Sequence, residues 1–129
     1  TISGVTIRYT TDGKIPSSSS TVYSLPLQVD STTVLRYRAF KDGYSPGITE
    51  TRTYFINETT DLPVFSLVTD PDNFFSDTSG IYVAGTNGII GNCSTEPRNW
   101  NQDWERPVSL EFFEPDKLLA FKVIHLRSS

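Results

Sequence analysis

The chain has 129 residues, of which 36% are hydrophobic, 20% charged and 12% aromatic. This size fits one ordinary domain or two small ones, and the composition is typical of an ordered β-rich protein. Eleven basic against fifteen acidic residues give a net charge of -4, which provides no general basic field for nucleic acid. No apolar run approaches the roughly 20 residues that span a bilayer. We therefore expect no nucleic acid partner and no membrane span.

The charge is unevenly divided along the chain. Residues 1–60 hold six basic and five acidic residues, whereas residues 61–129 hold five and ten. The polar stretch at the division lacks apolar periodicity, as linkers do. We predict domains at 1–57 and 62–129, joined by a linker at 58–61. Because the chain begins with Thr and has no signal-peptide pattern, we expect a processed or excised piece of a longer protein.

Three strands joined by turns are predicted in the first domain. Apolar and polar residues alternate from Val5 to Thr10, which is the period of a half-buried strand, and Asp12-Gly13 follows as a tight turn. In the segment 33–40, Leu35, Tyr37 and Ala39 alternate with Arg36 and Arg38. We expect one buried and one solvated face there. Residues 49–56 are rich in Thr, Tyr, Phe and Ile and predict the third strand.

The second domain mixes strands with a long loop. The apolar run 62–69 predicts a strand buried on both faces. Asp70 and Pro71 are typical of the start of a helix, so residues 71–75 are predicted to form one helical turn. A brief strand is expected at 80–83 and a long loop at 85–105. Two strands, at 106–114 and 118–126, are then predicted to form a β-hairpin around Pro115-Asp116.

Two turns and their spacing carry a family resemblance in the first domain. The runs Ile7-Arg8-Tyr9-Thr10-Thr11-Asp12-Gly13 and Ala39-Phe40-Lys41-Asp42-Gly43-Tyr44-Ser45-Pro46, with Thr53-Tyr54 after them, resemble the small β-sandwich at the C-terminus of chitobiases and β-hexosaminidases. The resemblance covers residues 1–56. It implies that one or two strands precede Ile7 in the complete sandwich.

A second resemblance covers residues 62–116. The run Leu62-Pro63-Val64-Phe65-Ser66-Leu67-Val68-Thr69-Asp70-Pro71 and the later run Trp104-Glu105-Arg106-Pro107-Val108-Ser109-Leu110-Glu111-Phe112-Phe113 are similar to the opening segment of bacterial CotH kinase-type proteins. This resemblance implies a secreted or cell-surface protein. In that family the catalytic positions lie downstream of this segment, so no catalytic residue is transferred to this chain.

These observations together predict an all-β fold. We expect an incomplete sandwich of immunoglobulin or fibronectin type III type, followed by a second small β-rich unit with a C-terminal hairpin. An incomplete sandwich would leave the strand from Val5 to Tyr9 as an exposed edge, and exposed edges recruit partners. Self-association through this edge is therefore expected, together with contacts to neighbouring domains of the parent protein.

The residues that could perform catalysis or bind metal are few. Cys93 is the sole thiol and His125 the sole histidine, and we interpret them as a small loop residue and a packed imidazole rather than a nucleophile and its base. No cluster has the ligands and spacing of a zinc site. Asp70, Asp72, Asn73 and Asp77 fail the EF-hand pattern, and Asp70 is expected to cap a helix. We expect no metal, no cofactor and no enzymatic activity in this chain.

Three further features have ordinary explanations. Glu111 and Glu114 lie three residues apart on a strand, hence on opposite faces, so we interpret them as solvated or paired charges rather than a glycosidase pair. Gly85, Gly88 and Gly91 precede no Lys-Ser/Thr and are interpreted as points of loop flexibility. Tyr44, after the Lys41-Asp42-Gly43 turn, is predicted to cover the core.

Trp100 and Trp104 are the candidate carbohydrate contacts. They bracket Asn101, Gln102 and Asp103, so indole rings that could stack on a sugar lie beside amides and a carboxylate that could bind hydroxyls. The alternative is a place in the core, which we expect for Trp104 and leave open for Trp100. The leading hypothesis is a non-catalytic accessory or structural module with weak polysaccharide contact. The alternatives are a carbohydrate-binding module of a glycoside hydrolase system and a fragment of a CotH-type kinase whose active site lies outside this chain.

Overall fold

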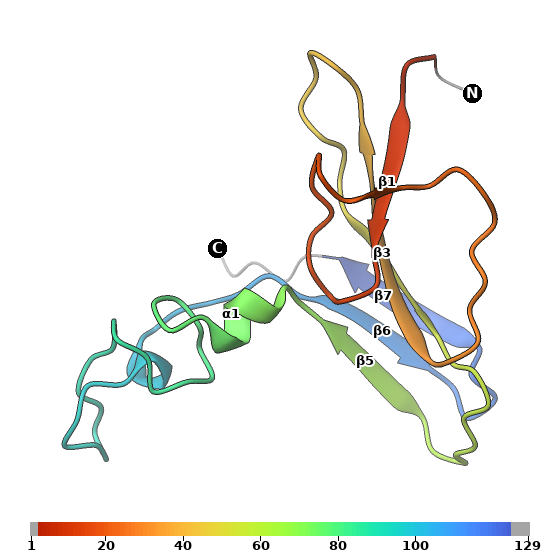
Figure 1. Cartoon of the computed structure of the whole chain (residues 1–129). Coiled ribbons are helices and arrows are strands. Elements are labelled where there is room, and N and C mark those ends of the chain that lie inside the picture. Colours follow the sequence, from red (N-terminus) through yellow and green to blue (C-terminus); the bar gives the residue numbers. More distant parts are fainter. Residues whose placement is uncertain (1–2, 125–129) are drawn as a thin grey trace. The chain divides into compact units, whose positions relative to one another are not determined.

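The computed structural model describes residues 3–124 of the chain (Figure 1). Most of the regular structure in this range is β-strand, arranged in two antiparallel sheets. The predicted all-β class is confirmed. The described residues include no helix with the length and apolar character needed to cross a membrane.

The first sheet has the strand order β2-β1-β3-β4. Its strands are β1 (Thr6–Thr10), β2 (Thr21–Val22), β3 (Thr33–Phe40) and β4 (Glu50–Tyr54). The three strands predicted in this part of the sequence are therefore confirmed, β3 with the predicted bounds and β1 and β4 slightly shorter. In the central pair, Tyr9 lies opposite Tyr37 and Arg8 opposite Arg38. This register places tyrosines on one face and arginines on the other, because successive side chains alternate across a strand.

The edge predicted at Val5 to Tyr9 is largely occupied. Arg8 and Tyr9 pair with β2, and the backbone N–H of Tyr23 donates to the carbonyl oxygen of Ile7 at 2.8 Å. Strand β1 is thus flanked on both sides. The strand through which self-association was expected is therefore largely unavailable as a free edge. Self-association of the chain itself stays a prediction.

The second sheet has the order β5-β6-β7. Its strands are β5 (Val64–Val68), β6 (Ser109–Phe113) and β7 (Leu119–Ile124). The predicted hairpin is confirmed between β6 and β7, with Lys117 at a positive φ of 64° in the connecting turn. Strand β5 pairs with β6 although residues 69–108 separate them in the sequence.

The chain forms two compact units. In the described range, the sheet unit comprises residues 3–68 and 108–124, and the loop unit comprises residues 69–107. This division differs from the predicted domains, because the pairing of β5 with β6 and the contacts of β4 with β6 join both sheets in one unit. The domain boundary predicted at 58–61 is not tested by this division and stays a prediction.

Side chains of the second sheet satisfy the free edge of β4. The backbone N–H of Thr53 donates to Oε2 of Glu111 at 2.8 Å, and Nζ of Lys122 donates to the carbonyl oxygen of Thr51 at 2.7 Å. Lys122 also pairs with Glu50 at 2.8 Å. An edge strand has backbone groups without ladder partners. Here charged side chains take the place of the absent neighbouring strand.

The interior of the sheet unit is accordingly polar. Glu111 and Thr51 are each 1% exposed, and Arg36 is 7% exposed and donates to the carbonyl oxygen of Gly13 at 2.7 Å. The prediction of a solvated face is wrong for Arg36, because a backbone carbonyl supplies a partner for its charge within the fold. Phe113 is buried and meets the Phe55 ring edge-on at 4.9 Å.

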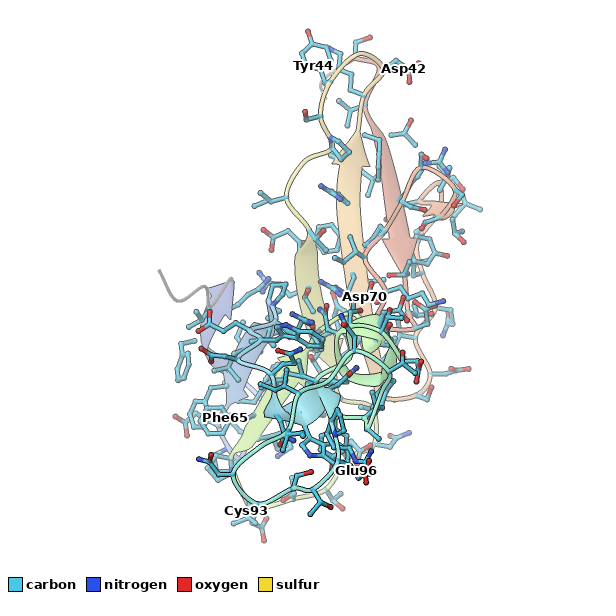
Figure 2. The ribbon with its side chains drawn as sticks, turned by 90° about the vertical axis from the view of Figure 1, so that its left-hand side faces the viewer. Asp42, Tyr44, Phe65, Asp70, Cys93 and Glu96 are labelled. Atoms are coloured by element: carbon cyan, nitrogen blue, oxygen red, sulfur yellow. The ribbon has the colours of Figure 1, made fainter. Side chains whose placement is uncertain are left out.

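Strand β5 is buried on one face, not on both as predicted. Phe65 and Leu67 are 62% and 54% exposed, whereas Val68 is buried. Figure 2 shows the Phe65 side chain directed away from its sheet. The aromatic contacts of Phe65 are with Phe112 and Phe121 on the same outer face. An apolar run alone did not reveal that only one face of this strand is covered.

The loop unit contains the predicted helical turn, α1 (Pro71–Phe75). Asp70 caps it as expected, because its side chain accepts a hydrogen bond from the backbone N–H of Asp72 at 3.1 Å. The strand expected at 80–83 is wrong. The backbone N–H groups of Gly80, Ile81 and Tyr82 donate instead to carbonyl oxygens of α1 and the residue that follows it, so this segment folds back on the helix.

Asn99 organises the rest of the loop unit. It lies at the start of η1 (Asn99–Asn101), is fully buried, and donates from Nδ2 to the carbonyl oxygen of Asp77 at 2.9 Å. Its Oδ1 accepts from the backbone N–H of Asn87 at 3.0 Å, and its own backbone N–H donates to Ala84 at 2.7 Å. One side chain therefore ties three loop segments together.

Candidate functional site

The tyrosine face of the first sheet forms a groove in the sheet unit. Strand β1 supplies Ile7 and Tyr9, β3 supplies Leu35 and Tyr37, and β4 supplies Tyr54. Alternation places these side chains on one face of the sheet. The sequence signal was correct as to the face, but this face is half-buried and lines an opening rather than a closed core.

The loop between β2 and β3 forms the wall of this groove. Tyr23 is held by the hydrogen bond from its backbone N–H to Ile7, and Pro26, Leu27, Gln28 and Val29 continue the wall. The loop runs apart from the strands in Figure 1. The volume of this open groove is about 780 Å³, within the range of roughly 300–1,000 Å³ of small-molecule sites. We call this site the tyrosine groove.

The lining of the tyrosine groove is aromatic and uncharged. It includes four tyrosines and the amide of Gln28, and it has no Asp, Glu, Lys, Arg or His. Tyr23 and Tyr54 are 47% and 43% exposed, so their rings and hydroxyls are accessible to a ligand. A tyrosine offers an apolar face and a polar end. Such a lining suits a neutral ligand with both apolar faces and hydroxyl groups.

The two predicted carbohydrate contacts lie in the loop unit. Trp100 is in η1 and is 53% exposed, whereas Trp104 is half-buried with the Arg106 guanidinium 5.0 Å from its ring centre. No ring contact joins the two indoles in the described part of the chain. The core position predicted for Trp104 is thus only partly realised.

The amides between these tryptophans have structural partners. Nδ2 of Asn101 donates to the carbonyl oxygen of Ile89 at 2.9 Å, and Nε2 of Gln102 donates to that of Asn87 at 2.8 Å. These NH2 groups, expected to bind sugar hydroxyls, are engaged in holding the loop. Asp103 is exposed. Of the two predicted tryptophan contacts, Trp100 is therefore the one with an exposed ring.

We predicted that the glycines of this loop provide flexibility, but the structure gives them another role. A Cβ at Gly85 would lie 2.0 Å from the Asn99 side chain, and one at Gly88 would lie 2.0 Å from the backbone of Arg98. Gly91 is similarly close to Asn101. These residues are glycine because the backbone passes close to other chain segments.

The remaining candidates stay apart from one another. Cys93 is an exposed free thiol at a loop end, as Figure 2 shows, and His125 lies outside the described residues. Glu111 is paired, with its Oε1 3.4 Å from Nη1 of Arg52, while Glu114 is exposed. Among residues 3–124 no three His, Cys, Asp or Glu side chains gather in a way that could hold a metal ion.

Tyr44 is exposed and does not cover the core as predicted. It is 69% exposed at the tip of the loop that follows β3, near Asp42 (Figure 2). The centre of its ring lies 4.9 Å from Nζ of Lys41. Tyr44 thus contacts a cation instead of packing on the apolar interior.

Comparison with known families concerns the N-terminal part of the chain. Residues 1–51 match the family model described as the chitobiase/beta-hexosaminidase C-terminal domain. No curated protein and no solved structure matches the chain. The match agrees with the resemblance found in residues 1–56, whereas the resemblance of residues 62–116 to CotH-type proteins stays a prediction. Residues 1–51, which hold all the lining of the tyrosine groove except Tyr54, are thus similar to a non-catalytic accessory domain associated with carbohydrate-acting enzymes.

Proposed function

We propose that the chain is a non-catalytic accessory module of a secreted or cell-surface bacterial protein, and that it contacts polysaccharide through the tyrosine groove. The observation that carries the proposal is the uncharged groove of about 780 Å³ with four tyrosines in its lining. The chitobiase-type match of residues 1–51 supports the carbohydrate association. The secreted or surface location rests on the family resemblances.

The chemistry of the groove favours a neutral sugar over a charged ligand. A pyranose has faces of C–H groups that pack on aromatic rings and hydroxyls that exchange hydrogen bonds with tyrosines and amides. The lining supplies both types of group, and no lysine, arginine or carboxylate lies among its residues. Because the groove is open, it suits contact with a chain of sugars rather than full enclosure of one.

The test replaces the two most accessible tyrosines of the groove. Tyr23→Ala and Tyr54→Ala are expected to lower retention on insoluble chitin or cellulose about tenfold together, since an aromatic contact contributes about 0.5–1.5 kcal/mol. Tyr82→Ala is the matched control, because Tyr82 is 74% exposed in the loop unit. Equal retention of the double variant and the control, with melting temperatures unchanged, would contradict the proposal.

A carbohydrate-binding module acting through Trp100 and Trp104 is the second candidate, and the exposure of Trp100 favours it. Loss of chitin or cellulose retention in Trp100→Ala, but not in the tyrosine variants, would support it. The CotH-type kinase fragment rests on the resemblance of residues 62–116, and the full-length sequence decides it.

A further inference from the structure

We propose that Arg8, Arg38 and Lys41 form a second site, on the face of the first sheet opposite the tyrosine groove, which binds the oxyanion of an acidic saccharide. The ligand is a sugar with a carboxylate or a sulfate ester. This site goes beyond the proposed function, because it uses other residues and a ligand of opposite chemistry to that of the uncharged groove.

The argument begins with the strand register. Arg8 on β1 lies directly opposite Arg38 on β3. Side chains opposite each other in an antiparallel pair share a face, with Cβ atoms about 4.5–5.5 Å apart, and like charges in this position are destabilising. The fold therefore places two cationic side chains on neighbouring positions of one face, and both line the same pocket.

Among residues 3–124, no carboxylate forms an ion pair with either arginine. Nη1 of Arg8 donates to the carbonyl oxygen of Ser20 at 2.6 Å, and Nε of Arg38 donates to that of Gly47 at 2.5 Å. The ion pairs found within residues 3–124 are those of Arg52 and Lys122. Each backbone carbonyl orients a guanidinium through one of its five N–H donors. The other donors of each planar group can serve an oxyanion, which arginine binds in bidentate fashion.

Both arginines face a pocket of about 640 Å³. Lys41 adds a third positive charge to its lining, and Asp42 is the one carboxylate there, so the lining has a net charge of +2. Tyr44 and Ser18 also line the pocket. The exposed Tyr44 ring, close to Lys41, offers a stacking surface beside the cations.

This combination fits an acidic sugar better than a nucleic acid. Nucleic acid binding requires an extended basic surface that follows a phosphate backbone, whereas these cations are confined to one pocket of a chain with net charge -4. A single oxyanion on a sugar ring satisfies the arginine pair, while the ring and hydroxyls meet Tyr44 and Ser18.

The experiment measures binding of the intact chain to three soluble polymers by affinity electrophoresis. Polygalacturonate carries carboxylates, dextran sulfate carries sulfate esters, and dextran is neutral. The proposal predicts retardation by at least one of the acidic polymers, weakened by salt, and none by dextran. Retardation by polygalacturonate alone assigns the carboxylate, and retardation by dextran sulfate alone assigns the sulfate ester. No retardation by either acidic polymer at low salt overturns the proposal.

Matched variants locate the site. The double variant Arg8→Gln/Arg38→Gln is expected to lose binding to the acidic polymer at least tenfold, while Arg98→Gln, in the loop unit, retains it. Lys41→Gln, which leaves the strand pair intact, is expected to lose a smaller part and serves if the double variant does not fold. Unchanged binding in the arginine and lysine variants, or an equal loss in Arg98→Gln, overturns the proposal.

The two sites can fail independently. Tyr23→Ala/Tyr54→Ala is expected to keep binding to the acidic polymer, and Arg8→Gln/Arg38→Gln is expected to keep retention on chitin or cellulose. Thermal unfolding gives a second measure: the acidic polymer should raise the melting temperature of the wild type and leave that of the arginine double variant unchanged. A rise of equal size in both proteins counts against the arginine pair.

Discussion

The sheet unit and the loop unit are each stabilised internally by a different kind of interaction. In the sheet unit, successive backbone pairs fix five strand partnerships. The loop unit has only the short elements α1 and η1, and its segments converge on the side chain of Asn99. A ladder spreads its stabilisation over many equivalent bonds, whereas a single buried amide concentrates it. The two units should therefore respond differently to single substitutions.

In the sheet unit, too, one buried side chain makes several stabilising contacts. Glu111 accepts a hydrogen bond from the edge of β4 and pairs with Arg52, and it is almost fully buried. It joins the two sheets through polar contacts where most sandwiches use apolar ones. The comparison between the units is therefore sharpest at Glu111 and Asn99, one buried polar residue in each.

The largest effect is expected for Glu111→Ala. The change leaves the backbone N–H of Thr53 and the charge of Arg52 without their partner, and breaking a buried pair in this way costs several kcal/mol. Because Arg52 is 38% exposed and can be solvated, we expect a loss of about 3 kcal/mol in the free energy of unfolding. Chemical denaturation followed by circular dichroism measures it.

Glu114→Ala is the control for this prediction. Glu114 follows the same strand but is exposed, so its loss should change the unfolding free energy by no more than about 0.5 kcal/mol. Similar unfolding curves for the two variants would show that the polar contact between the sheets contributes little to stability.

A smaller and more local effect is expected for Asn99→Ala. The substitution removes the partners of the Asp77 carbonyl and the Asn87 N–H in a buried place, at a cost of about 1–3 kcal/mol. Hydrogen exchange should accelerate in residues 77–101 and stay unchanged in β1, β3 and β6. Asn92→Ala, at an exposed position of the same loop, should leave exchange as in the wild type. Faster exchange throughout the sheets would contradict the separation of the units.

The smallest effects are expected for the tryptophans. Trp100→Ala should change the unfolding free energy by no more than about 0.5 kcal/mol, as exposed positions do. Trp104→Ala should cost about 1 kcal/mol, because its half-buried ring also loses the contact with Arg106. Thermal unfolding of both variants measures the difference. A loss of more than about 3 kcal/mol for Trp104→Ala would instead restore the core position predicted from the sequence.

Local sequence patterns predicted the secondary-structure elements well, but they predicted the burial and neighbours of those elements less well. The alternation in 33–40, the Asp70-Pro71 helix start and the hairpin around Pro115-Asp116 each depend on neighbouring residues, and each is confirmed. The candidate site was predicted less well. The face that carries Tyr9 and Tyr37 was identified, but its groove was not, because the groove depends on where the loop 23–29 passes.

Local sequence patterns were sufficient to predict the all-β class, most of the strand positions and the alternation of side chains between the two faces of a strand, because this alternation is set by the local backbone. Which faces are covered depends instead on the tertiary structure. It brought β6 beside β5 across residues 69–108, buried Glu111 and Arg36, and left Phe65 and Tyr44 exposed. Burial depends on contacts between distant segments, and hydrogen bonds formed in those contacts let charged residues occupy the interior while apolar rings remain at the surface.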